Sequence, residues 1–192
     1  MLHLTIMDKK LKTELEELKK DIFSNEWETV KSAGNRLGKI GGTEVVNFLI
    51  SLLNLDNSSI RNTAALALEE IKDNRAVEPL LNSIFKKENH NYNGTMVFAL
   101  KSLNCSGYVT DIFKILFYEI YEAKLSAYAI LNDQIFEFTE AEIREVQKIW
   151  ADCKLNPKDC EGYEDEKIRE MMEDAFEGYI GYLDDEAMID NF

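Results

Sequence analysis

Proline, glycine, cysteine and histidine are all scarce in this chain of 192 residues. It contains two prolines, nine glycines, three cysteines and two histidines. The shortage of proline and glycine argues against a loop-rich all-β fold, a collagen-like repeat and a low-complexity linker, and it favours helices. Three cysteines are too few, and too irregularly spaced, for a small domain held together by disulfides.

The cysteines are predicted to be free thiols in a reducing compartment. Cys153 and Cys160 stand seven positions apart, which is not the close spacing of a zinc-binding pair. A regulatory or metal-binding pair formed by these two residues is the alternative interpretation. Cys105 follows Leu103 and Asn104 at the end of an expected helix, and we expect a buried structural thiol there.

Basic residues are outnumbered, and long apolar runs are missing. The chain has 36 acidic residues against 22 basic ones, a formal net charge of −14. Proteins that bind nucleic acids or anionic membranes usually have an excess of Lys and Arg, so this composition argues against both as partners. No stretch is long and apolar enough for a membrane span, and the start of the chain does not read as a signal peptide. We therefore expect a cytoplasmic protein.

Apolar residues recur at helical spacing along most of the chain. Leu11, Leu15, Leu18 and Ile22 follow one another at steps of three or four, which predicts an amphipathic helix over 8–23. Beyond it, a pattern of two apolar helix faces around a short turn occurs three times in register, at 34–49, 60–81 and 97–112. Hairpins repeated in this way bury a continuous core only when they stack on one another.

A looser fourth copy follows, and in it Thr139 and Glu142 have the spacing of a capping box. The last segment, 156–192, differs in composition, since it holds 13 acidic and three basic residues and so has a net charge of −10. Its apolar residues still keep helical spacing: Ile168, Met172, Phe176, Tyr179 and Leu183. We expect an acidic helix that docks on the last repeat.

The second copy resembles the HEAT-like repeat consensus, especially the short form found in bacterial repeat proteins and phycobilin-lyase-related chains. The resemblance rests on Ile60, Arg61, Ala64, Ala65, Leu68, Ile71, Asp73, Ala76, Val77, Pro79, Leu80 and Leu81. In the first copy, Gly41 and Gly42 replace the turn aspartate and Val30 the arginine, and the third copy lacks the turn aspartate and the proline. We expect Asp73 to accept hydrogen bonds from the free N–H groups of the helix that follows.

The resemblance implies an all-α solenoid of antiparallel helix hairpins whose second helices line a concave face, and it implies binding rather than catalysis. We expect a single domain over 1–192, with an N-terminal helix over 8–23, about four HEAT-like hairpins over 25–155 and the acidic helical segment over 156–192.

The sequence contains none of the motifs of common enzyme classes. It has no glycine-rich phosphate loop and no nucleophile elbow, and the acidic stretch 159–166 lacks the ligand order of a calcium loop. His3 and His90 are the two histidines. We interpret His90 as a solvated loop residue, with a metal site built from His90 and distant acids as the alternative. We therefore predict no enzymatic activity, no metal and no cofactor.

These observations lead us to expect a monomeric, non-enzymatic module that binds a basic protein. The leading hypothesis is an immunity-type inhibitor that neutralises a nuclease-like toxin by electrostatic occlusion of its cationic cleft. The candidate contact residues are two tyrosines and two acidic triplets: Tyr118, Tyr121, Glu164, Asp165, Glu166, Asp184, Asp185 and Glu186. The alternative is a general HEAT-like scaffold or adaptor that uses its concave face, while an accessory enzyme subunit and a nucleic-acid-binding repeat protein are less favoured. The acidic segment could also be no more than a solubilising face.

Overall fold

The computed structural model describes the backbone of residues 2–189 and the side chains of residues 9–183. The described backbone consists of helices joined by short connections and contains no β-strand, as predicted. None of the described helices is long and apolar enough to cross a membrane. His3 and the predicted contact residues Asp184, Asp185 and Glu186 lie outside the described side chains. The chain divides into two compact units, Met1–Ser83 and Ile84–Phe192.

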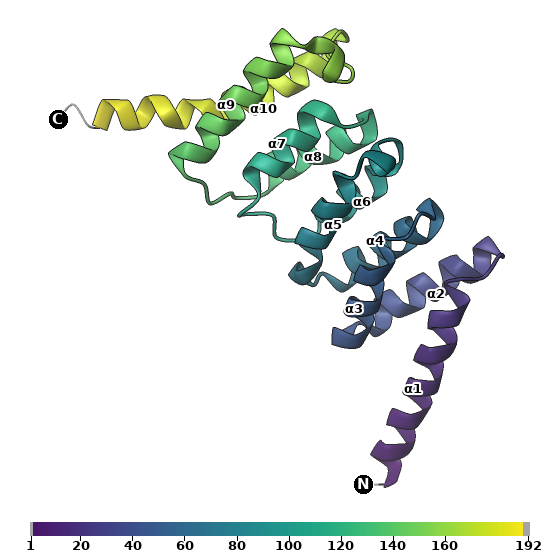
Figure 1. Ribbon diagram of the computed structural model, residues 1–192. Coiled ribbons are helices and arrows are strands. Elements are labelled where there is room, and N and C mark those ends of the chain that lie inside the picture. The colour runs from purple at the N-terminus through teal and green to yellow at the C-terminus, as the bar shows by residue number, and fades with distance from the viewer. Residues whose placement is uncertain (1, 190–192) are drawn as a thin grey trace. The chain divides into compact units, whose positions relative to one another are not determined.

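The first unit contains the N-terminal helix and the first two predicted hairpins (Figure 1). Its elements are α1 (Leu2–Asp21), α2 (Trp27–Ile40), α3 (Gly42–Leu52), α4 (Ser58–Ile71), the short 3₁₀ helix η1 (Asn74–Ala76) and α5 (Val77–Ile84), whose last residue belongs to the second unit. Helix α1 packs on α2, and α4 packs on both α2 and α3. The apolar residues of the repeated pattern, such as Leu37, Leu49, Leu68 and Leu80, are fully buried.

Helices α2 and α4 approach closely because α2 presents glycine to α4. A Cβ atom built on Gly34 would lie 2.2 Å from Cγ2 of Thr63, and one on Gly38 would lie 3.4 Å from Cα of Ala67. The Thr63 side chain is itself held in place, since its hydroxyl donates to the Ser59 carbonyl oxygen at 2.9 Å. Gly34 and Gly38 therefore set the distance between the first helices of neighbouring hairpins.

The turn of the second hairpin has the structure expected from its aspartate. Helix α4 ends at Ile71, and the next residue, Lys72, has a left-handed backbone with φ of 58°. The Asp73 carboxylate then accepts a hydrogen bond from the Arg75 N–H at 3.0 Å and pairs with the Arg75 guanidinium at 2.6 Å. This guanidinium and the backbone hydrogen bond hold the pKa of Asp73 below its ordinary value. The predicted capping role of Asp73 is confirmed.

The second unit contains the other two predicted hairpins and the acidic helix. Its elements are η2 (Lys87–Tyr92), α6 (Gly94–Leu100), α7 (Val109–Tyr118), α8 (Tyr121–Asp133), α9 (Glu140–Leu155), η3 (Pro157–Asp159) and α10 (Glu166–Ile189). Helix α8 packs on α6 and α7, α9 packs on α7, and α10 packs on α8 and α9 (Figure 1). The predicted capping box at the start of α9 is present, with Thr139 and Glu142 bonded to each other's backbone N–H groups.

Aromatic side chains dock α10 on the rest of the second unit, as the apolar spacing predicted. The Tyr179 ring meets Phe113 edge-on at 5.2 Å, and its hydroxyl donates to the Leu131 carbonyl oxygen at 2.8 Å. Burial raises the pKa of Tyr179 to about 12. The ring centroid of Trp150 in α9 lies 5.0 Å from that of Phe117 and 5.8 Å from that of Phe176. The described part of α10, up to Leu183, is therefore docked on the core of this unit.

The prediction of free thiols is wrong for two of the three cysteines. Cys153 and Cys160 form a disulfide, with Cα atoms 5.6 Å apart. Helix α9 ends at Leu155 and the chain reverses through η3, so Cys160 returns to the last turn of α9. Sequence spacing did not reveal this reversal. Cys105 is a buried free thiol, as predicted, and burial raises its pKa to about 12.

The close contact between α2 and α4 can be tested with glycine substitutions. We expect Gly34→Ala to lower the free energy of unfolding by about 1–3 kcal/mol, because the new methyl group overlaps Thr63. Thr63→Ser removes the overlapping methyl group and should recover most of that loss in the double variant. The control is Gly178→Ala in α10, where a Cβ meets nothing within 4 Å and should stabilise by about 0.5–1 kcal/mol. Additive effects of the Gly34 and Thr63 substitutions in urea unfolding would contradict this account.

The disulfide can be tested by counting reactive thiols. The native protein should show almost no reaction with Ellman's reagent at pH 8, because Cys105 is buried and its pKa is raised. Unfolding in urea without reductant should expose one thiol, and unfolding after reduction should expose three. Three thiols in the unfolded, unreduced protein would mean that Cys153 and Cys160 are not bonded.

Candidate functional site

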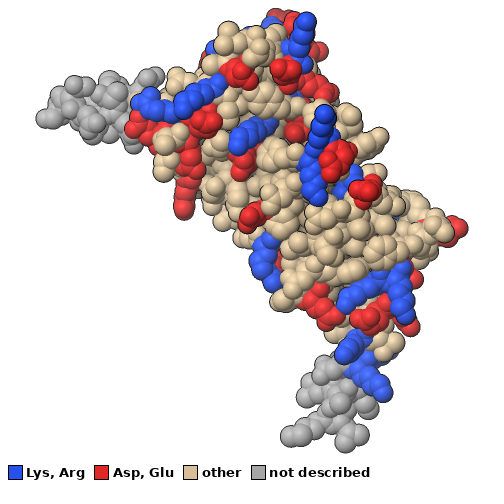
Figure 2. Space-filling model, viewed as in Figure 1, with Lys and Arg blue, Asp and Glu red and all other residues tan. Residues whose placement is uncertain are grey.

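The acidic excess of the chain is concentrated in the second unit. Residues 84–192 include 23 acidic and 11 basic residues, a net charge of −12, whereas residues 1–83 have a net charge of −2. In the view of Figure 2, acidic and basic side chains lie next to one another, with uncharged surface between them. The acidic side chains therefore form no unbroken patch in that view, and the net negative charge is spread over the second unit.

A pocket of about 490 Å³ opens in the second unit where α8 and α10 begin. Its lining combines three aliphatic or thioether side chains, one aromatic ring, one acid and one base: Leu125, Ile168, Met171, Tyr121, Asp165 and Lys167. One wall therefore belongs to the first two turns of α8, and the other to the first two turns of α10.

Helix α8 supplies two exposed apolar side chains to this pocket. Tyr121 is the first residue of the helix and Leu125 lies one turn later, so the two share a face. Tyr121 is 50% exposed and Leu125 is 42% exposed. Large apolar side chains that remain half-exposed next to each other in a pocket are typical of binding sites.

The start of α10 forms the opposite wall. The Asp165 carboxylate accepts hydrogen bonds through Oδ1 from the backbone N–H groups of Lys167 and Ile168, at 2.9 and 3.2 Å, and so caps the helix. Gly162 lies just before this cap with φ of 76°, and a Cβ there would lie 2.8 Å from Cδ1 of Ile168. The glycine thus allows both the turn and the close placement of Ile168.

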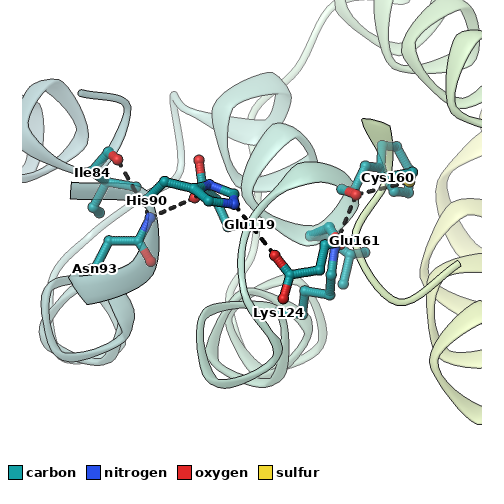
Figure 3. A network of polar contacts seen from close by, with 9 residues as sticks. Ile84, His90, Asn93, Glu119, Lys124, Cys160 and Glu161 are labelled. Atoms are coloured by element: carbon teal, nitrogen blue, oxygen red, sulfur yellow. Dashed lines mark hydrogen bonds and ion pairs between the residues drawn. The ribbon is translucent and has the colours of Figure 1, made fainter. Parts of the chain in front are cut away.

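A network of polar side chains joins residues near η2, the corner after α7 and the segment before α10 (Figure 3). The buried Glu119 carboxylate accepts a hydrogen bond from the Asn93 amide at 2.5 Å and contacts Nδ1 of His90 at 2.8 Å through the same oxygen. The other ring nitrogen of His90 lies 3.3 Å from the Glu161 carboxylate, so the ring bridges two acids. The predicted solvated loop histidine is 39% exposed, but it is also held by Glu119 and Glu161, which the chain fold brings to His90 from distant positions.

No described group of three or more His, Cys, Asp or Glu side chains is arranged to hold a metal ion. In the network, the two carboxylates face opposite nitrogens of the His90 ring instead of a common point. A doubly protonated ring can donate to both carboxylates, whereas a neutral ring can donate to only one of them.

Lys124 is a second buried member of this region. Its side chain is fully buried, and its ammonium group donates to the carbonyl oxygens of Leu116 and Phe117 at 3.0 and 2.9 Å. These carbonyl groups end α7, where a helix favours a positive charge. Burial lowers the pKa of Lys124 to about 8, against the opposing effect of the nearby Glu161 and Glu119 carboxylates.

One of these carbonyl groups also lies next to the disulfide. The Phe117 oxygen lies 2.8 Å from Sγ of Cys160, which has no hydrogen to donate while it is bonded to Cys153. Lys124 holds the end of α7 against α8, and His90 joins Glu119 of this corner to Glu161 of the segment that leads into α10. Since Tyr121 follows this corner directly and Asp165 ends that segment, the network positions both walls of the pocket.

The structure brings together only some of the predicted contact residues. Tyr121 and Asp165 line the same pocket, and Glu164 and Glu166 flank Asp165 as exposed residues. Tyr118 lies elsewhere, since its hydroxyl donates to the Asp152 carboxylate at 3.1 Å, and its burial raises its pKa to about 12. A role for these residues in binding a partner stays a prediction.

Sequence reasoning did not identify Lys124, Glu119 or Asn93 as buried polar residues. A signal existed for Lys124, which precedes the buried residues Ala127 and Leu131 by three and seven positions and so lies on the apolar face of α8. No local signal marks Glu119 and Asn93, because their partners come from distant parts of the sequence.

A family model of HEAT repeats matches residues 15–119, which is more than half of the chain. The chain belongs to the HEAT-repeat family. This match confirms the resemblance seen in the second hairpin and the prediction of an all-α fold of HEAT-like helix hairpins. No curated protein matches the sequence. The matched region of this HEAT-repeat protein ends before Tyr121, so the residues that line the pocket all lie beyond it.

The buried lysine predicts an unusual dependence of stability on pH. The native state should release the Lys124 proton near pH 8, whereas the unfolded chain keeps it up to the ordinary value of 10.5. The unfolded state then binds more protons between these values, so the contribution of Lys124 to stability should rise with pH. Relative to Lys124→Met, the wild type should gain on the order of 2–3 kcal/mol between pH 7.5 and 10 in urea unfolding.

The matched control for this experiment is Lys148→Met, because the Lys148 side chain is 76% exposed. The difference between this variant and the wild type should stay nearly constant over the same pH range. An equally constant difference for Lys124→Met would show that Lys124 keeps its proton in the folded protein.

Proposed function

We propose that this HEAT-repeat protein is a non-enzymatic module that binds a basic protein through its second unit. HEAT repeats commonly mediate protein interactions, which supports the coarser part of the proposal. The observation that supports the finer part is the pocket that joins Tyr121 and Asp165 within a unit of net charge −12. The most specific form of the proposal is an immunity-type inhibitor that occludes the cationic cleft of a nuclease-like toxin.

Electrostatic attraction would act mainly on the rate of association. A net negative unit steers a cationic partner toward it over several ångströms, and salt screens this effect. Figure 2 shows basic side chains among the acidic ones, so charge alone does not define a contact surface. The exposed Tyr121 and Leu125 supply the apolar contact that a specific interface needs at its centre.

The proposed compartment is the cytoplasm, and the proposed state of the free protein is a monomer. The disulfide between Cys153 and Cys160 argues against the cytoplasm, because such bonds are uncommon in reducing surroundings. The thiol count described above, repeated on protein alkylated directly in its native cells, therefore also tests this part of the proposal.

The alternative function is a general scaffold that binds partners through more than one surface. A feature of the first unit favours it, namely a pocket of about 220 Å³ at the starts of α2 and α4. Its lining includes Trp27, which is 50% exposed, together with several hydroxyl and amide groups such as Ser24, Asn25, Asn57 and Ser59. A scaffold of this kind would bind its partners with little dependence on salt.

Charge reversal at the proposed surface tests the function. The partner is isolated from native lysate with the tagged protein, washed at about 0.15 M and about 1 M salt, and its association with the purified chain is then followed by stopped flow. Glu164→Lys combined with Glu166→Lys should lower the association rate constant roughly tenfold at low salt. A basic partner whose nuclease activity the chain abolishes would support the immunity-type form.

The control combines Glu28→Lys with Glu78→Lys, which changes the net charge equally but in the first unit. Both residues are exposed and lie in the first turn of a helix, like Glu166. This control should slow association much less. Equal slowing by both double variants would attribute association to total charge alone, and partners that survive high salt would favour the scaffold.

A further inference from the structure

We propose that the pocket between the starts of α8 and α10 receives one long cationic side chain, an arginine or a lysine, from the basic partner. This inference rests on the proposed function and specifies how the partner is recognised. It commits the pocket to an occupant with an apolar stem and a positively charged end. The lining residues match these two parts separately.

The floor of the pocket fits the stem of such a side chain. Leu125, Ile168 and Met171 offer aliphatic and thioether surface along the two helices. Lysine and arginine cover apolar surface of this kind with their methylene groups while the charged end remains near water. Leu125 is 42% exposed in the free protein, more than Ile168 or Met171, so it has the most apolar surface to bury under a ligand.

The rim of the pocket fits the charged end. Oδ1 of Asp165 is occupied by the two backbone N–H groups that it caps. Among the described residues, its second oxygen, Oδ2, forms no hydrogen bond and no ion pair. A guanidinium or ammonium group can donate to Oδ2 without disturbing the cap. The half-exposed Tyr121 ring lines the opposite wall, and aromatic rings of this kind attract cations.

Lys167 lines the pocket with a positive charge that repels a cationic occupant. Its side chain lines the same pocket and is exposed, and it forms no ion pair among the described side chains. A cation that enters must therefore approach Asp165 next to a like charge. The pocket thus predicts substitutions of opposite sign, since removal of Lys167 should strengthen binding and removal of the Asp165 charge should weaken it.

The net charge of the unit decides between this occupant and an anionic one. A carboxylate that entered to pair with Lys167 would meet Asp165, the flanking Glu164 and Glu166, and a net charge of −12. Repulsion from these groups disfavours it. An aliphatic side chain would fill the floor but would leave the free oxygen of Asp165 without a partner.

The first test uses single side-chain probes on the full chain. The methyl resonances of Leu125, Ile168 and Met171 are followed by NMR while N-acetyl-argininamide, N-acetyl-norleucinamide or N-acetyl-glutamate amide is added. We expect the arginine probe to shift these resonances with a dissociation constant on the order of millimolar, as befits so small a ligand. The other two probes should bind at least fivefold more weakly. Equal or tighter binding of the norleucine or glutamate probe would overturn the proposal.

Substitutions in the pocket give the second test. Asp165→Asn should weaken the arginine probe about fivefold while it keeps the cap, since the side chain of Asn57 caps α4 in this same protein. Tyr121→Leu should weaken it about threefold, and Lys167→Met should tighten it two- to threefold. Glu177→Gln, at an exposed position of α10 outside the pocket lining, is the control and should change little. Weaker binding by the Lys167 variant, or no effect of the Asp165 variant, would refute the assignment.

The isolated partner separates failure of this inference from failure of the proposed function. If the partner binds tightly and Glu164→Lys with Glu166→Lys slows its association, but Asp165→Asn and Tyr121→Leu leave its affinity unchanged, the function stands and the pocket assignment is wrong. If the arginine probe binds as expected and no basic partner exists, the pocket assignment stands and the proposed function is wrong.

Discussion

The constraint on which both units depend is that no hairpin of this chain can bury its own apolar face. Neighbouring first helices must come close enough to share a core, and glycine makes that approach possible. Gly34 and Gly38 of α2 lie against Thr63 and Ala67 of α4. In the second unit, Gly94 at the start of α6 meets Glu122 of α8 in the same way, where a Cβ would lie 3.1 Å from the Glu122 Cβ. Small residues thus set the helix spacing, and the large apolar residues fill the space that remains.

Within the second unit, polar interactions supply what apolar packing alone does not fix. Lys124 ends α7 by bonding its last carbonyl groups, and Glu119 joins the following corner to His90 and Asn93. Because these contacts have defined directions, they hold the corner in one arrangement, which packing of interchangeable side chains would not ensure. Glu161 contacts His90 at this corner, and the disulfide ties the next segment to the last turn of α9. The elements that position the pocket are therefore joined by these bonds, although the residues that line the pocket are largely exposed.

In the proposed function, this arrangement would separate two tasks, attraction of a partner and its selection. Under the proposed function, the net charge of the second unit would attract and orient a cationic partner at a distance, and this needs no particular geometry. Selection among cationic partners would require a shaped contact, and the proposed one is the pocket, with its apolar lining, its tyrosine and the Asp165 carboxylate. Lys167 lines the same pocket, and under this proposal its charge would repel a cation that fits the pocket poorly.

The sequence alone determined the helical fold, the repeated hairpins and the membership of the HEAT-like class, because these depend on apolar spacing and local caps such as Asp73 and Thr139, which neighbouring residues decide. It also pointed to Tyr121 and Asp165, and it found the docked face of α10. Only the tertiary structure decided that these two residues share a pocket, that His90 bridges two acids and that Cys153 meets Cys160. Those outcomes depend on chain reversals and on contacts between residues tens of positions apart, for which a helical pattern contains no information.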